Sequence, residues 1–177
     1  AADLNELMTR LDLRDAVHGG FSMGTGEVAR YPGTYGSERV SRAVMMGVVP
    51  PFLLQTEDNP HGTPASTIEA TVEAIRTDRL AYLTGFYDAF YNLDEMLGTR
   101  VSEEVVRDSW NVAAAASPVG TLLCPPTWID DFREDVAGID VPTLVVHGTA
   151  DRILHIDATA RRLPALIDDC ELVEIEG

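Results

Sequence analysis

The first part of the chain alternates between helical and extended patterns of apolar residues. Four apolar side chains recur at the spacing of one helical face: Leu4, Leu7, Met8 and Leu11. This spacing predicts an amphipathic helix over residues 1–12. The residues that follow predict a short strand at 15–19, a helix at 23–35 and a buried strand at 39–46, which ends at Gly47.

The pattern changes over residues 50–138, where no strand pattern occurs. A polar loop, TEDNPHGTP, is followed there by helical patterns with clustered aromatic residues. Beyond this region, a continuous apolar run predicts a strand at 141–147, of the kind that is covered on both faces of a parallel sheet. A short helix at 157–166 and a last strand at 171–175 are predicted next.

Strands and helices that alternate on both sides of a helical segment indicate an α/β fold with an inserted cap. We therefore expect three segments: a first part of the core at 1–49, a helical cap at 50–138 and a second part of the core at 139–177. The chain has 177 residues, 45% of them hydrophobic, which is enough for one globular domain.

Composition narrows the classes of partner. The formal charge is −16 and all 13 basic residues are arginine, so an acidic surface disfavours nucleic acid. Two cysteines, Cys124 and Cys170, are too few for a disulfide framework or a metal cluster. No run approaches the roughly 20 apolar residues of a membrane span, so we expect a cytoplasmic protein without membrane contact.

A serine flanked by glycines follows the first predicted strand, in the stretch Gly20-Phe21-Ser22-Met23-Gly24. A serine hydroxyl becomes a nucleophile when a base takes its proton and the side chain projects from the backbone. A tight turn between strand and helix exposes it, and glycines on either side avoid collisions with the neighbouring strand and helix. The helix start also directs the Met23 N–H toward a developing oxyanion. The alternative is that Ser22 only caps the helix.

The acid that would support such a serine belongs at the carboxyl end of a later parallel strand. Asp151 follows the strand predicted at 141–147 through a glycine-containing turn, which brings it to that edge. Its alternative roles are to cap the next helix or to pair with Arg152. Asp157 and Asp140 are weaker candidates, because one opens a helix and the other precedes its strand.

Four stretches carry a family resemblance: GGFSMGTGEVARYPGTYG, PFLLQTEDNPHG, TGFYDAFYNLDEMLGTRVSEEVVRDSWN and VPTLVVHGTADRIL. Together they resemble the cofactor-free bacterial haloperoxidases, or perhydrolases, of the α/β-hydrolase fold. The similarity extends over essentially the whole chain. It implies the C-terminal part of a mostly parallel hydrolase sheet with a helical cap.

The resemblance also implies roles for individual residues. Ser22 corresponds to the nucleophile, Asp151 to the acid that orients the catalytic histidine, and Met23 to an oxyanion-hole donor. Aromatic residues of the cap, Phe52 and Trp128 among them, are candidates for the acyl pocket, and packing within the cap is their alternative role. The family needs neither haem nor a metal ion, so we expect no cofactor and no metal site.

The sequence departs from the family at both ends. The family begins with several strands and a loop that supplies a second oxyanion donor, and it ends with a catalytic histidine; neither segment occurs here. We therefore interpret the chain as an internal fragment that lacks N-terminal strands and a final helical segment. Four histidines are present: His18, His61, His147 and His155. None completes a triad, and His155 is the first alternative base, although its short tether to Asp151 is unfavourable.

The expected reaction is serine-dependent acyl transfer on an ester or a short carboxylic acid. The resemblance implies that hydrogen peroxide can replace water and release a peracid that oxidises a halide. The alternatives are an ordinary carboxylesterase or lactonase, and an inactive chain that serves as an interaction module. An unpaired edge on the strand at 15–19 would make the isolated chain aggregate or need a partner. The oligomeric state stays open, with a homo-oligomer among the alternatives.

Overall fold

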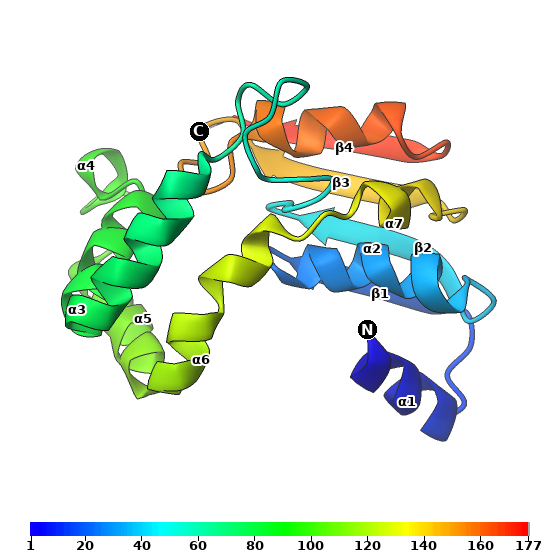
Figure 1. Ribbon diagram of the computed structural model, residues 1–177, viewed down its shortest axis with the longest axis horizontal. Coiled ribbons are helices and arrows are strands. Elements are labelled where there is room, and N and C mark those ends of the chain that lie inside the picture. Colours follow the sequence, from blue (N-terminus) through cyan, green and yellow to red (C-terminus); the bar gives the residue numbers. More distant parts are fainter. Residues whose placement is uncertain (177) are drawn as a thin grey trace. The chain divides into compact units, whose positions relative to one another are not determined.

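Four parallel strands form one sheet in the computed structural model, which describes residues 1–176 (Figure 1). They are β1 (Ala16–Phe21), β2 (Val40–Met46), β3 (Thr143–Gly148) and β4 (Cys170–Ile175), in the spatial order β1-β2-β3-β4. Every neighbouring pair is parallel. The carboxyl ends of all four strands therefore lie along the same edge, where ligand chemistry gathers in open α/β sheets. The predicted α/β class is confirmed.

Helices of the sheet-containing unit connect and cover these strands. They are α1 (Ala2–Arg10), α2 (Gly24–Tyr35) and α7 (Arg133–Ala137). The predicted helix at 23–35 is confirmed, and α2 packs along β1 and β2 (Figure 1). The inward side chains predicted for it, Val28, Ala29 and Tyr31, are all buried.

The prediction of one continuous helix at 157–166 is wrong. Two short 3₁₀ helices, η2 (Ile156–Ala158) and η3 (Ala160–Ala165), occupy this segment instead. Thr159 separates them with an extended φ of −131°, and Pro164 removes a backbone donor from the second. Because apolar residues still recur every three to four positions, Leu163 and Ile167 are buried as a helical pattern would require.

The close packing of α2 on α7 depends on small residues and one arginine. A Cβ on Gly26 would lie only 2.7 Å from a ring carbon of Phe132, so glycine is needed at this contact. The Arg30 guanidinium lies 4.5 Å from the centre of that ring and donates to Asp130 and Asp135 at 3.0 and 3.1 Å. Ring packing and ion pairs therefore hold the segment from residue 130 onward against α2.

The helical unit comprises residues 63–129 and is a compact body of its own. Its elements are α3 (Ala65–Phe90), α4 (Leu93–Met96), α5 (Glu103–Ala115), α6 (Pro118–Leu123) and the 3₁₀ helix η1 (Pro125–Ile129). Residues 63–129 lie within the predicted cap range of 50–138, and the rest of that range belongs to the sheet-containing unit.

Helix α3 is broken at Asp78, which adopts φ −153° and ψ 91°. The Asp78 carboxylate accepts from the backbone N–H groups of Leu80 and Ala81 at 3.1 and 3.0 Å, so it caps the second half of the helix. In that half, the aromatic residues expected to cluster do so, with Phe86 and Phe90 stacked at 5.5 Å and Tyr87 and Tyr91 at 5.8 Å.

Among the described residues, no single helix is long and apolar enough to cross a bilayer. Taken together, Glu103–Ala115 and Pro118–Ile129 reach the required length and composition, but the two segments are bent by 96° at their junction.

Candidate active site

Ser22 lies at the junction between β1 and α2, in a left-handed backbone conformation with φ 52°. Its N–H donates to the Met46 carbonyl at 2.9 Å, which continues the β1–β2 ladder by one residue. A serine rarely adopts this conformation without stabilising contacts, because the Cβ crowds the following carbonyl. The predicted tight turn is therefore present, and it projects a half-buried serine from the carboxyl edge of the sheet.

Thr25 stabilises this turn from the first helical turn of α2. Its hydroxyl donates to the Ser22 carbonyl at 2.6 Å and accepts from the Val49 N–H at 3.1 Å. The Thr25 N–H also donates to the Ser22 carbonyl, at 2.9 Å. Thr25 is completely buried, so it joins the strained serine to the loop that follows β2. The sequence analysis did not identify Thr25. A threonine three positions after the serine could have indicated this role, because a hydroxyl at that spacing often donates to the backbone carbonyl.

The two glycines beside Ser22 have different roles. A Cβ on Gly20 would lie 2.5 Å from the Gly24 carbonyl oxygen, so no larger residue fits there without a shift. A Cβ on Gly24 would meet nothing within 4 Å. The expectation that both glycines avoid collisions is therefore correct for Gly20 and wrong for Gly24 within the described residues.

Met23 is the N-cap residue of α2, with αR backbone angles of φ −52° and ψ −33°. The N-terminal end of a helix carries the positive end of its dipole. Met23 therefore lies directly after Ser22 at the positive end of α2, and its side chain is 45% exposed.

Asp151 follows β3 and holds its own loop. One carboxylate oxygen, Oδ1, accepts from the backbone N–H groups of Ile153 and Leu154, both at 2.8 Å. The other oxygen, Oδ2, lies 3.4 Å from Nε2 of His147. Ser22 follows β1 and Asp151 follows β3, so both residues lie at the carboxyl edge of the parallel sheet, with β2 between their strands.

His147 has a structural role. The Val48 N–H donates to its Nδ1 at 3.0 Å, so the proton lies on Nε2, which donates to the Leu154 carbonyl at 2.8 Å. The side chain is fully buried. Both ring nitrogens are therefore engaged, and this imidazole fixes the Asp151 loop.

The other three histidines have contacts elsewhere. His18 is buried against Tyr31, and its Nε2 lies 2.9 Å from the Met8 sulfur. His61 and His155 stack on each other at 5.5 Å. Among the described residues, no histidine has a hydrogen bond, ion pair or ring contact with Ser22, and the Ser22 hydroxyl makes no hydrogen bond.

The two predicted pocket residues lie in different units. Phe52, in the sheet-containing unit, carries the Arg133 guanidinium 4.8 Å above its ring. Trp128 lines a cavity of about 320 Å³ in the helical unit, together with Tyr82, Leu83, Phe86 and Cys124. Burial raises the pKa of the Tyr82 phenol, as expected for a hydroxyl in apolar surroundings.

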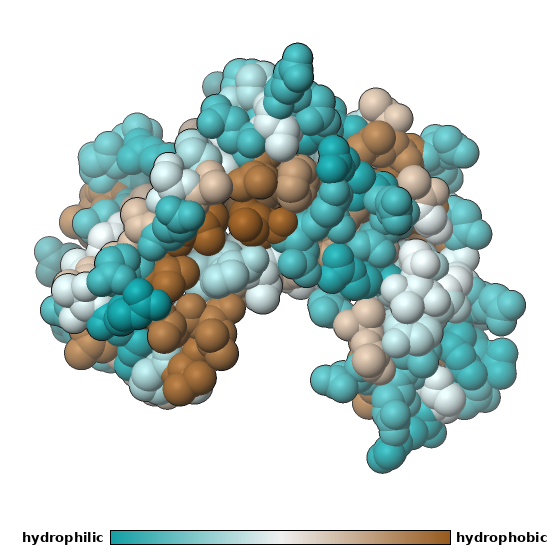
Figure 2. All heavy atoms as spheres, viewed as in Figure 1, coloured by the Kyte–Doolittle hydropathy of each residue, from teal (hydrophilic) through white to brown (hydrophobic). Residues whose placement is uncertain are grey.

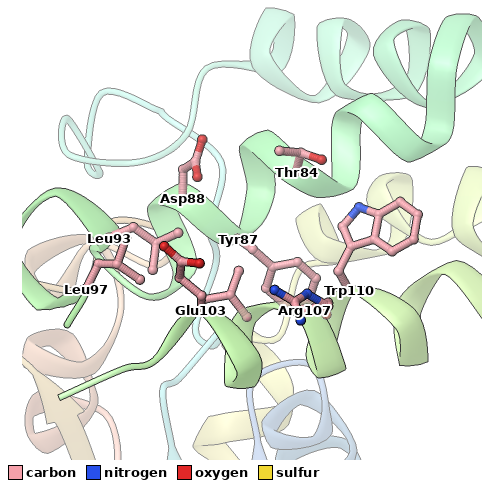
Figure 3. A pocket seen from close by; sticks show the side chains of 9 residues that line it. Thr84, Tyr87, Asp88, Leu93, Leu97, Glu103, Arg107 and Trp110 are labelled. Atoms are coloured by element: carbon pink, nitrogen blue, oxygen red, sulfur yellow. The ribbon is translucent and has the colours of Figure 1, made fainter. Parts of the chain in front are cut away.

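A second cavity of about 310 Å³ lies between α3, α4 and α5 of the helical unit (Figure 3). It is more polar, because Asp88, Glu103 and Arg107 contribute to its lining beside Trp110. Apolar side chains also gather on the surface of the helical unit (Figure 2), where Val112, Val119 and Leu123 are 68%, 65% and 63% exposed. The unit therefore offers apolar surface well beyond that of one small cavity.

Comparison with known families agrees with the fold. The sequence profile described as alpha/beta hydrolase fold matches residues 1–177. The chain therefore belongs to the α/β-hydrolase fold family.

Within that family, the similar proteins are non-heme haloperoxidases and esterases. The chain is 56% identical over 177 residues to a Synechocystis sp. protein named "Putative non-heme chloroperoxidase", and 36% identical over 178 residues to non-heme chloroperoxidase CPO-A1 of Kitasatospora aureofaciens. All of this chain is covered in both cases, but only 64% of each relative. The solved structure of a Bacillus anthracis bromoperoxidase is 37% identical, with a TM-score of 0.92 over 98% of this chain and 63% of that one.

Proposed function

We propose that Ser22 is the nucleophile of an acyl-transfer reaction, supported by Asp151 and by the N–H of Met23. The observation that carries this proposal is the left-handed conformation of Ser22 at the start of α2, at the carboxyl edge of a parallel sheet. Strain of this kind is costly, of order 1–3 kcal/mol, and is retained where function requires it.

In the proposed reaction, Ser22 Oγ attacks the carbonyl carbon of an ester or a short carboxylic acid while a histidine takes its proton. The carbonyl oxygen becomes negative and accepts from the Met23 N–H and from a second donor. Collapse of this intermediate expels the alcohol or water and leaves an acyl group on Ser22. None of the four histidines contacts Ser22 in the described residues, and the proposal assigns the role of base to a histidine that the Asp151 carboxylate orients.

Hydrogen peroxide is the proposed acceptor of the acyl group, as the relatives' names support. Its oxygen attacks the acyl carbon, the bond to Ser22 Oγ breaks, and the proton returns to the serine through the base, which releases a peracid. The peracid then transfers one oxygen atom to chloride or bromide, so that the halide is oxidised and the carboxylic acid is regenerated. One relative is the bifunctional esterase/perhydrolase DCH of Acinetobacter calcoaceticus, which is 30% identical over 185 residues. Its name gives both ester hydrolysis and perhydrolysis.

Ester hydrolysis is the second candidate, because water can replace hydrogen peroxide in the same step. An esterase structure from Exiguobacterium antarcticum resembles this chain with a TM-score of 0.88 at 27% identity. The two candidates are separated by comparing the rate of peracid formation from acetate and hydrogen peroxide with the rate of p-nitrophenyl acetate hydrolysis. A perhydrolase gives both, whereas an ordinary esterase gives only the second.

The test of the shared mechanism is p-nitrophenyl acetate hydrolysis by the protein expressed from its complete gene, beside Ser22→Ala and Asp151→Asn. We expect kcat to fall by roughly 10³-fold or more in each variant, since both residues act in one unit. Retained activity in Ser22→Ala would overturn the proposal. Asp168→Asn, which removes an exposed carboxylate just before β4, serves as the control and keeps its activity.

A further inference from the structure

His61 and His155 lie face to face although they come from segments far apart in the sequence. Their ring centres are 5.5 Å apart and the ring planes differ by only 8°. The Asp157 carboxylate completes the group, with its Oδ2 3.7 Å from Nδ1 of His155. One ligand atom from each of the three residues lies within 4.8 Å of the others. We propose that His61, His155 and Asp157 bind a divalent transition-metal ion such as Zn²⁺.

The backbone on both sides of the group is well fixed. Before His61, Thr56 and Asn59 exchange two backbone hydrogen bonds of 3.2 and 3.1 Å, and the buried Asn59 amide donates to the Phe52 carbonyl at 2.8 Å. His155 follows directly on the loop that Asp151 holds through two backbone N–H groups. The backbone that carries the two histidines is therefore held in place beside the third ligand, Asp157.

The distances require a modest closure. Tetrahedral zinc with ligands at about 2.0–2.2 Å places its ligand atoms roughly 3.3 Å apart, against the present maximum of 4.8 Å. His61 and His155 are exposed, and rotation about the bond to an imidazole ring meets only shallow barriers. At Nδ1 of His155, the ion would replace the Asp157 N–H, which donates there at a long 3.3 Å.

The charges around the group favour a cation. Asp157 Oδ1 accepts from Arg161 at 2.7 Å, and Arg161 also donates to both oxygens of Glu174, at 2.8 and 2.6 Å. Arg161 therefore forms ion pairs with both Asp157 and Glu174. Two carboxylates and one guanidinium leave a net negative charge, and Asp157 Oδ2 faces His155 rather than the arginine.

The ligand types select the metal. Two imidazoles and one carboxylate suit Zn²⁺, Co²⁺, Ni²⁺ or Cu²⁺, whereas Ca²⁺ and Mg²⁺ prefer oxygen ligands. Three protein ligands leave one tetrahedral position for water. The remaining two histidines, His18 and His147, are buried, so His61 and His155 are the histidines of this chain that an ion can reach from solvent.

The test is Co²⁺ and Zn²⁺ titration of the purified protein, followed by visible absorption and calorimetry respectively. We expect one equivalent of Co²⁺ to give the intense d–d bands of tetrahedral coordination, and Zn²⁺ to displace it and raise the melting temperature. His61→Asn and His155→Asn each weaken binding by about tenfold or more, because each removes a ligand. Asp168→Asn, which removes an exposed carboxylate outside the group, leaves the affinity unchanged.

Absence of the Co²⁺ bands, or an affinity that the two histidine variants leave unchanged, would overturn the proposal. Both histidines are exposed, so the variants keep the fold, and unchanged circular dichroism verifies this. The readouts are optical and calorimetric, so they do not depend on the chemistry proposed for Ser22.

Discussion

At the residue scale, the serine turn depends on one buried hydroxyl. Thr25→Val keeps the shape of the side chain but leaves the Val49 N–H without its acceptor and the Ser22 carbonyl without one donor. We expect the free energy of unfolding to fall by about 1–3 kcal/mol, the cost of an unsatisfied buried polar group. Thr25→Ser keeps the hydroxyl and stays close to the wild type in urea denaturation. Equal stability of the valine variant and the wild type would show that the two hydrogen bonds contribute nothing.

His18 gives the protein a pH-dependent stability. Burial lowers its pKa from the usual 6.5, so the folded chain keeps this imidazole neutral where the unfolded chain already binds a proton. The free energy of unfolding therefore falls as the pH drops below 6.5, because protons favour the unfolded state. His18→Leu removes this dependence between pH 6.5 and about 5, before the carboxylates titrate.

The control for His18 is Val17→Ala, which changes the exposed neighbour of His18 on β1 and removes no ionisable group. This variant keeps the wild-type slope of stability against pH in denaturant titrations. A slope that His18→Leu does not change would contradict the assignment of the effect to His18.

At the element scale, the junction of β1 and α2 tolerates a methyl group at one glycine and not at the other. Gly20→Ala places a Cβ 2.5 Å from the Gly24 carbonyl oxygen, so the strand or the helix must shift. We expect a loss of about 1–3 kcal/mol in thermal or urea unfolding, as for overpacked cores. Gly24→Ala enters open space at the first residue of α2 and leaves stability unchanged or slightly higher. The reverse order of the two variants would contradict this description of the turn.

Elements with a strong local pattern could be predicted from the sequence. The strand, serine and helix around Ser22 follow from apolar spacing and two glycines within a few positions, and so does β3 from a continuous apolar run. The sequence predicts one helix at 157–166 where two 3₁₀ helices lie, because apolar spacing does not distinguish an α-helix from 3₁₀ turns and Pro164 disfavours a continuous α-helix.

Contacts between distant segments could not be predicted in this way. The bond from Val49 to Thr25, the Arg133 guanidinium over Phe52 and the stacking of His61 on His155 each depend on how the loops fold back. The sequence predicts Phe52 as a residue of the acyl pocket or of the packed cap, because a single sequence does not indicate which cation will cover an aromatic ring. The break of α3 at Asp78 likewise results from a side-chain cap that competes with the helix, not from a proline or glycine.

At the scale of the whole molecule, the sheet described here has two edge strands, β1 and β4. Among residues 1–176, β1 pairs with β2 alone, and Val17 and Phe21 are 56% and 58% exposed. The self-association expected of such an edge stays a prediction, which size-exclusion chromatography of the 177-residue chain checks directly. The chain spans 64% of the length of the curated relatives named above, so activity is best measured on the product of the complete gene.

The central claim is that Ser22 is a reactive nucleophile, and covalent labelling tests it most directly. The protein expressed from its complete gene is treated with a fluorophosphonate, which reacts with activated serines, and the modified peptide is identified by mass spectrometry. The account predicts a single adduct on Ser22 that is absent from Ser22→Ala and much slower to form in Asp151→Asn. Labelling on another serine, or an equally fast reaction in Ser22→Ala, would contradict it.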